Sequence, residues 1–273
     1  MTTHTDRWRL DLVLLGIGGA FDADRGCANT NALLELHRPG VRPWRVLLDC
    51  GHTCGRQLGQ LGLGYDDIDE AIITHAHGDH IDGLEVFGYK SLFLHQRRPS
   101  LRAEGRVLEQ IWASLRPKMG TLQRGPGESV QVGLDTYFDP SPLTEAPFAL
   151  AEGALEARLF AVPHVAGMPC FGVMLGVPGG QALVRWSGDT TFQADSPLFA
   201  ALDAERPERI FHDCLFYPYY PGTVHTHADE LMGLSPKLRQ RIVLIHHGQS
   251  AREEDLGGMV LGQALDRFSF FAD

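Results

Sequence analysis

A run of potential metal ligands at residues 75–80 constrains this chain more than any other feature. The run reads His-Ala-His-Gly-Asp-His and follows an apolar segment. Side chains two residues apart in an extended chain point to the same side, so we expect His75 and His77 to face one site. Asp79 and His80 follow where we expect the chain to turn into a helix. Imidazoles and carboxylates suit zinc, and this spacing disfavours the alternative of a solvated polar loop. The run predicts two adjacent metal ions.

Three further candidate ligands each close an apolar, strand-like run, and they are His164, Asp189 and His246. Asp189 stands in a Ser-Gly-Asp-Thr turn, whereas His246 ends its run directly. His247 remains an alternative to His246, because a shift of one residue reverses the direction of a side chain in a strand. We prefer His246 because it is the residue that ends the run.

Length and composition indicate one enzyme-sized domain. The chain has 273 residues, of which 44% are hydrophobic, so we expect residues 1–273 to form a single domain. No apolar run approaches the roughly 18 residues of a membrane span, and the first residues lack a secretory apolar region. We therefore expect a cytoplasmic protein without a membrane partner. The cysteines show no regular framework, which suits a reducing compartment. Cys50 and Cys54 could bind metal, but a strand-to-helix turn is the preferred interpretation.

Apolar periodicity predicts a mixed α/β fold. Strands are expected at 10–17, 32–36, 44–48, 157–161, 172–175, 182–186, 210–212 and 242–245, and helices at 54–61, 80–85 and 103–115. The Gly- and Pro-rich stretch 117–147 predicts an irregular connection or lid. Within it, Tyr137 and Phe138 could line a pocket or pack beneath the loop. The glycines at 16–19 lack the full dinucleotide fingerprint, so no nucleotide-cofactor site is expected.

The ligand pattern resembles the metallo-β-lactamase superfamily. This chain can fill its His-x-His-x-Asp-His motif and the separate His, Asp and His that follow. The resemblance implies an αββα four-layer sandwich with the site at the C-terminal ends of its strands. It also implies two zinc ions, with manganese as an alternative metal. One ion would take His75, His77 and His164, the other would take Asp79, His80 and His246, and Asp189 would bridge both.

Two later motifs narrow the resemblance to the ribonuclease Z branch of phosphodiesterases. Residues 211–216 read Phe-His-Asp-Cys-Leu-Phe, and residues 224–228 read Val-His-Thr-His-Ala. The resemblance implies His225 as a proton donor that Asp213 holds. The branch has Glu where this chain has Asp213, so the reach is shorter by one methylene. Together with Asp79, which would orient the attacking hydroxide, these are the expected catalytic residues.

Two observations disfavour a tRNA substrate. The segment between His164 and Asp189 is too short for the tRNA-grasping arm of long-form ribonuclease Z enzymes. The formal net charge of -10 also differs from the basic footprint of polyanion binders. A small cluster of arginines lies within 97–106, and a solvated helix face is its alternative interpretation.

The expected function is that of a dinuclear-zinc phosphodiesterase acting on a small nucleotide, and a 3′,5′-cyclic nucleotide is the preferred class. The alternatives are an RNA 3′-end endonuclease, a lactone or thioester hydrolase, and a protein that binds a nucleotide without turnover. A homodimer is expected from the resemblance, and Tyr217, Tyr219 and Tyr220 could serve it or stack a base. The roles of His212 and His227 stay open.

Overall fold

Apolar runs from both halves of the chain build two β-sheets. The computed structural model describes residues 8–23, 26–192, 205–218, 222–249, 251 and 256–272. The first sheet contains β1 (Trp8–Leu14), β2 (Ala32–His37), β3 (Trp44–Leu48), β4 (Glu70–Ile72), β5 (Ser100–Glu104), β8 (Asp139–Leu143) and β16 (Arg267–Ala272). The second contains β9 (Phe148–Leu150), β10 (Leu155–Ala161), β11 (Phe171–Gly176), β12 (Ala182–Trp186), β13 (Arg209–Asp213), β14 (Ile242–Ile245) and β15 (Val260–Leu261). Their spatial orders are β16-β1-β2-β3-β4-β5-β8 and β15-β14-β13-β12-β11-β10-β9.

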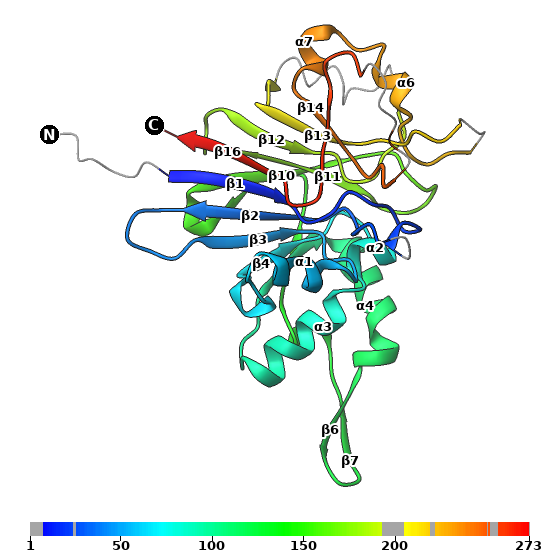
Figure 1. Ribbon diagram of the computed structural model, residues 1–273. Helices are drawn as coiled ribbons and strands as arrows, with labels where there is room; N and C mark the ends of the chain where they lie inside the picture. The colour runs from blue at the N-terminus through cyan, green and yellow to red at the C-terminus, as the bar shows by residue number, and fades with distance from the viewer. Residues whose placement is uncertain are drawn as a thin grey trace, which may run out of the picture.

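Helices lie outside both sheets (Figure 1). The helices are α1 (Cys54–Gln60), α2 (Gly78–Ile81), α3 (Leu84–Tyr89), α4 (Gly105–Met119), α6 (Ala228–Leu231) and α7 (Pro236–Arg239). Short helical turns of other types are η2 (Tyr65–Asp67), η3 (Lys90–Leu94), η4 (Leu134–Thr136) and η5 (Ala151–Gly153). In Figure 1, α1, α3 and α4 lie beside the first sheet, and α6 and α7 lie beyond the second. This arrangement confirms the expected αββα sandwich.

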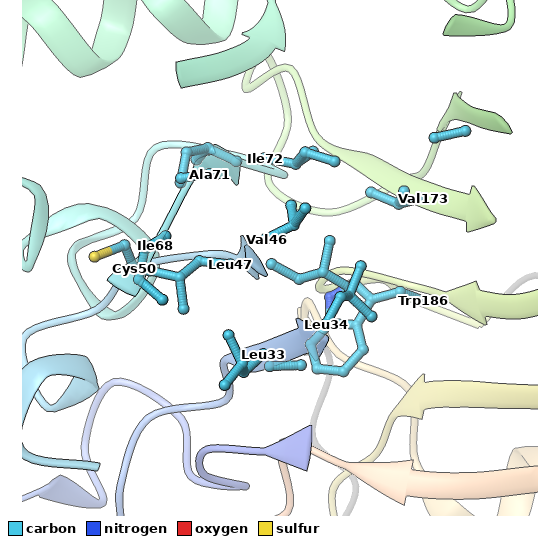
Figure 2. Close-up of a cluster of buried hydrophobic side chains, with 14 of the residues drawn as sticks. Leu33, Leu34, Val46, Leu47, Cys50, Ile68, Ala71, Ile72, Val173 and Trp186 are labelled. Atoms are coloured by element: carbon cyan, nitrogen blue, oxygen red, sulfur yellow. The ribbon is translucent and has the colours of Figure 1, made fainter. Parts of the chain in front are cut away.

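The space between the sheets holds much of the hydrophobic core (Figure 2). Neighbouring residues of a strand point to opposite faces, so a central strand of a sandwich with helices outside buries both sets of side chains. Leu34 and Ile72 lie toward Val173 and Trp186 of the second sheet, whereas Leu33 lies on the other side of its strand. Burial on both faces explains why these strands read as continuous apolar runs in the sequence.

The C-terminal ends of several strands meet at one edge of the sandwich. β3 and β4 pair in parallel, and so do β12 with β13 and β13 with β14. β10 runs in the same direction as β12 because both are antiparallel to β11. The loops that follow these strands therefore share an edge, and most of the candidate ligands stand in those loops.

Two expected helices have different limits in the structure. The expected helix 80–85 is divided between α2 and α3, with Gly83 between them. A side-chain carbon at Gly83 would lie 2.4 Å from the Gly51 carbonyl oxygen, so only glycine fits this close approach of the two backbones. The expected helix 103–115 begins later, because residues up to Glu104 pair with β8 as part of β5.

The prediction of an irregular connection over 117–147 is wrong. This stretch contains a hairpin of β6 (Thr121–Gly125) and β7 (Glu128–Gln131), which extends away from the sandwich in Figure 1, and it then supplies β8 to the first sheet. The Gly-Pro-Gly sequence that suggested a loop instead forms the hairpin turn, where Gly127 has a φ of +78°. Tyr137 and Phe138 are buried and pack against the α3 region, so they do not line the site.

Candidate metal centre

The structure brings all seven candidate ligands together at the shared edge. The first group contains His75, His77, His164 and Asp189, and the second contains Asp79, His80, Asp189 and His246. Within each group the ligand atoms lie within 4.8 Å of one another. Asp189 belongs to both groups, so one carboxylate connects two potential metal positions.

The first group joins the loop after β4 to the loop after β10. His77 Nδ1 lies 3.0 Å from His75 Nε2 and 3.1 Å from His164 Nε2. Asp189 Oδ2 lies 3.7 Å from His75 Nε2 and 3.9 Å from His164 Nε2. Three imidazole nitrogens therefore converge beside one carboxylate.

The second group is more deeply buried and richer in carboxylates. Asp189 Oδ1 lies 3.3 Å from His80 Nε2, and Asp189 Oδ2 lies 3.3 Å from His246 Nε2. Asp79 Oδ2 lies 3.5 Å from each of the same two nitrogens. Two imidazoles thus face two carboxylates.

Outer partners orient the imidazoles of both groups. His80 Nδ1 donates to Asp49 Oδ2 at 2.8 Å, and His164 Nδ1 donates to the Val224 carbonyl at 2.8 Å. His75 Nδ1 lies 3.0 Å from Thr74 Oγ1, which itself donates to Asp49. A partner on Nδ1 leaves the Nε2 lone pair facing the centre, which is the arrangement of metal-binding histidines.

Asp49 is a site residue that our sequence analysis missed. It follows β3, is fully buried, accepts from the Thr74 backbone N–H at 2.8 Å, and contacts His80 directly. Its φ of +62° is unusual for a residue with a side chain, as is the φ of +65° at His246. An aspartate that ends a predicted strand was the available signal, since several of the candidate ligands also end strands.

The residues fit a divalent metal. Among the described residues, the buried Nε2 atoms of His80 and His246 have no hydrogen-bond partner, and both face carboxylate oxygens. Burial by itself would raise the pKa of Asp189, but the adjacent His246 and His80 outweigh it and hold that pKa well below its usual range. Charged carboxylates and inward-facing imidazole lone pairs are the donors that zinc and similar cations bind.

His225 and Asp213 form a pair at the edge of the second group. His225 Nδ1 lies 2.9 Å from Asp213 Oδ2, so the shorter aspartate still reaches the imidazole. Burial would lower the pKa of His225, but the charge and hydrogen bond of Asp213 outweigh it and raise that pKa. The other oxygen, Asp213 Oδ1, lies 3.5 Å from His246 Nδ1, so one buried carboxylate contacts both a candidate ligand and the candidate proton donor.

Three further histidines near the site, His212, His227 and His247, lie outside the two ligand groups. His247 lies outside both ligand groups, with Nε2 3.1 Å from the Gly262 carbonyl. His212 is buried in β13 and also lies outside the groups. His227 accepts from the Asp229 backbone N–H through Nδ1 and donates to the Tyr217 carbonyl through Nε2 at 2.6 Å, so it joins the start of α6 to the loop of Tyr217. Tyr219 and Tyr220 lie outside the described residues, and a homodimer built on their loop stays a prediction.

A pocket of about 450 Å³ opens onto the metal centre. Its polar lining residues include candidate ligands and the candidate proton donor, and they are His77, Asp79, Asp189, His225 and His246. Its apolar lining residues, referred to as the apolar end, are Ala20, Phe21, Leu215, Tyr217 and Val224, and Asp22 lines the pocket next to Phe21 in the sequence. The size falls within the range of roughly 300–1,000 Å³ that is usual for small-molecule sites.

Solved structures share this architecture at low sequence identity. The metallo-β-lactamase fold protein YhfI from Bacillus subtilis superposes with a TM-score of 0.69 at 16% identity, over 96% of this chain and all of that chain. A diphosphatase from the PhnP family gives a TM-score of 0.64 at 17% identity, over 96% and 98% of the two chains. The short form of human tRNase Z gives 0.62 at 17% identity, over 94% and 98%. These likenesses confirm the expected metallo-β-lactamase fold, which a short-form tRNase Z shares.

The fold and the clustered ligands define the class of metal-dependent hydrolases with the metallo-β-lactamase fold. Within that class, the chain belongs to the family of the Anti-Pycsar protein Apyc1, whose family model matches residues 10–263. It is 30% identical to the Anti-Pycsar protein Apyc1 of Saccharibacillus brassicae, over 89% of this chain and 92% of the relative. It is 32% identical to the protein of that name from Bacillus phage 010DV004, over 90% and 92%.

No helix among the described residues is both long and apolar enough to cross a membrane. All five cysteines are unpaired with one another. Cys50 and Cys54 are buried in the hydrophobic core, and α1 begins at Cys54 shortly after β3 ends at Leu48, as the interpretation of a strand-to-helix turn predicted.

Proposed function

We propose that this protein hydrolyses a 3′,5′-cyclic nucleotide with two divalent ions, zinc or manganese, bound in the candidate metal centre. The observation that carries the proposal is the combination in one pocket of two ligand groups, an adjacent proton donor and an apolar end. A cyclic nucleotide has the matching parts, because its phosphodiester is charged, its leaving group is an alkoxide, and its base has flat faces that can pack on apolar side chains.

The ligand sets follow from the two groups. His75, His77 and His164 would hold one ion, Asp79, His80 and His246 the other, and Asp189 would contact both. Bound ions of this kind lower the pKa of water toward about 7 and neutralise phosphoryl oxygens.

Asp79 and His225 would perform the proton chemistry. Asp79 lines the pocket as a charged carboxylate, because His80 and His246 outweigh its burial and lower its pKa, so it can orient the attacking oxygen through a hydrogen bond. Attack at phosphorus breaks the bond to one ribose oxygen. His225 would donate its proton to that oxygen, which leaves a ring-opened nucleoside monophosphate.

Asp213 would fix the tautomer of His225 and favour its protonated form. Its Oδ2 accepts from His225 Nδ1, which leaves Nε2 as the atom that can serve the substrate, and its charge favours the protonated imidazole. A backbone N–H from Thr190 also donates to Oδ2 at 2.8 Å, so the carboxylate itself is held from the loop that carries Asp189.

The surroundings of the site favour a small substrate over tRNA. Only β11, β12 and short connections lie between His164 and Asp189, so no arm extends from this segment. The basic cluster is engaged by its own chain, since Arg97 donates to the Tyr65 and Ile68 carbonyls and Arg98 donates to the Asp135 carbonyl. These carbonyl contacts use some of the guanidinium donors and leave fewer of them for a polyanion.

Mass-spectrometric product analysis tests the proposal. Protein loaded with zinc or manganese is incubated with a panel of cyclic mono- and dinucleotides, beside an Asp79→Ala variant. We expect metal-dependent ring opening of 3′,5′-cyclic mononucleotides that the variant lacks. An untouched panel, together with hydrolysis of a lactone, a thioester or an RNA 3′ end, would establish one of the alternative reactions.

A His225→Ala variant separates phosphodiester from acyl chemistry. Removal of the proton donor should slow cleavage of an alkoxide ester by roughly 10²–10⁴-fold, the usual contribution of a positioned acid. Cleavage of an aryl phosphodiester, whose leaving group needs no proton, should change much less. Equal losses on both substrates would contradict the role of His225 as a proton donor.

A further inference from the structure

The apolar end of the pocket contains two large aromatic side chains that none of the proposed chemical steps uses. Phe21 is 91% exposed and Tyr217 is 44% exposed, although both line the pocket beside the metal centre. They come from distant parts of the sequence, the loop after β1 and the loop after β13. Exposed aromatic side chains that border a polar site are characteristic of a surface that contacts a ligand.

Phe21 stands in a tight turn that is tied to the metal centre. The Asp22 backbone N–H donates to the Gly19 carbonyl at 3.3 Å, and the Gly19 N–H donates to Asp22 Oδ2 at 2.9 Å. The turn rests on His246, because a side-chain carbon at Gly19 would lie 2.7 Å from His246 Cε1. Only glycine permits this approach, and the turn thereby presents Phe21 at a defined place relative to the candidate ligands.

Tyr217 is held from a separate element. Its carbonyl accepts from His227 Nε2 at 2.6 Å, while His227 Nδ1 accepts from the first turn of α6. The loop that carries Tyr217 is therefore joined to a helix of the second sheet. Both aromatic side chains thus belong to segments whose backbone is fixed by polar contacts, which lowers the entropy lost when a ligand packs on them.

We propose that Phe21 and Tyr217 are the residues that hold the base of the substrate, by stacking on its faces at the apolar end of the pocket. This inference rests on the proposed function, since it requires a substrate with a base beside its phosphodiester. Stacking suits this position because the apolar lining side chains Ala20, Leu215 and Val224 offer no hydrogen bonds. The Asp22 carboxylate, which also lines the pocket, already accepts from the Gly19 N–H.

The test compares a substrate that has a base with one that has none. The kcat/KM is measured for adenosine 3′,5′-cyclic phosphate and for methyl riboside 3′,5′-cyclic phosphate, with wild type, Phe21→Ala and Tyr217→Ala. Each variant should lose roughly 5- to 150-fold on the base-bearing substrate, which corresponds to ~1–3 kcal/mol for a stacked base. The baseless substrate should change less than about 2-fold. Phe93→Ala is the matched control, because Phe93 is an aromatic residue of η3 with 58% exposure that does not line the pocket.

The outcomes separate this inference from the proposed function. If wild type opens both rings and the variants lose equally on both substrates, or on neither, base stacking is overturned while the phosphodiesterase stands. If wild type opens neither ring, the proposed function fails. Binding of 2-aminopurine riboside 3′,5′-cyclic phosphate then decides the inference, since stacking on Phe21 and Tyr217 should quench its fluorescence in wild type and Phe93→Ala but not in the other variants. Equal quenching in all proteins would overturn it.

Discussion

Among the residues that the structure describes, aspartate, glutamate and histidine side chains gather in two clusters, and only one of these has the donors of a metal centre. The candidate centre collects imidazoles and carboxylates at the strand ends. The second cluster consists of Asp11, Glu35 and His37 on β1 and β2, with ligand-type atoms equally close together. Asp11 and Glu35 are both buried, so burial does not separate the two clusters.

The difference lies in what neutralises the carboxylates. In the β1–β2 cluster, Arg267 Nη1 donates to Asp11 at 2.7 Å and to Glu35 at 2.9 Å, and Arg45 Nε donates to Glu35 at 2.9 Å. Ser269 Oγ adds a bond to Asp11 at 2.7 Å. Guanidinium groups occupy the oxygens and bring positive charge that repels a cation. In the candidate centre the carboxylates face imidazole nitrogens, which can give their lone pairs to a metal.

The largest expected effect comes from removing one carboxylate charge in each cluster. Asp189→Asn should lower phosphodiesterase activity on the order of 10³-fold, because it removes the charge that faces both metal positions. Asp11→Asn makes the same chemical change and should keep activity within about 2-fold. Steady-state kinetics together with metal analysis by mass spectrometry checks both. Loss of metal from Asp11→Asn would contradict the distinction between the clusters.

A chelator should affect the candidate metal centre and leave the β1–β2 cluster unchanged. Bound metal at a hundredfold excess over its Kd stabilises a protein by about 2.7 kcal/mol, so a chelator should lower the Tm by roughly 5–10 °C at 2–4 °C per kcal/mol. Calorimetry with and without chelator measures the shift. Arg267→Met, which alters only the β1–β2 cluster, should show the wild-type shift, whereas Asp189→Asn should show a smaller one. An equal wild-type Tm with and without chelator would contradict the proposed metal centre.

Substitution of Asp49 tests whether a residue that orients a candidate ligand affects the affinity for metal. Asp49→Asn leaves every proposed ligand in place but weakens the hold on His80, so metal affinity should fall by roughly 10–100-fold. Competition with a chromogenic zinc chelator gives the affinity. Glu35→Gln is the matched control, since it also changes one buried carboxylate and should leave affinity unchanged. An unaltered affinity in Asp49→Asn would show that the ligands hold their positions without it.

The smallest expected effect is the pH dependence of the β1–β2 cluster. Burial would raise the pKa values of Asp11 and Glu35, but the bonds from Ser269, Arg45 and Arg267 outweigh it and lower both below their ordinary 3.8 and 4.5. A lowered folded-state pKa stabilises the protein above the ordinary value, and this contribution is lost as the pH falls.

Arg267→Met should therefore reduce the free energy of unfolding by about 1–3 kcal/mol near neutral pH. The difference from wild type should stay level down to about pH 5 and shrink below about pH 4. Denaturant unfolding in the presence of a chelator measures it without the metal contribution. A difference that grows as the pH falls would contradict this explanation.

Much of the fold could be predicted because the local pattern of apolar residues agrees with the strands that these segments form. The apolar runs at 32–36, 44–48 and 182–186 are strands in the structure. Predictions failed where a local sequence is compatible with two different structures. The Gly-Pro-Gly segment near 126 suits a loop and a hairpin turn equally, and only its pairing of β6 with β7 decides between them.

The candidate site shows the same division. The spacing of His75, His77, Asp79 and His80 indicated by itself the presence and chemical type of the site, because covalent neighbours on one short segment cannot be far apart. The roles of Asp49 and His227, the contact of Asp213 with His246, and the meeting of Phe21 with Tyr217 in one pocket were decided only by the tertiary structure. Those residues are far apart in sequence, and their chemistry depends on partners that the packing of two sheets brings to one edge.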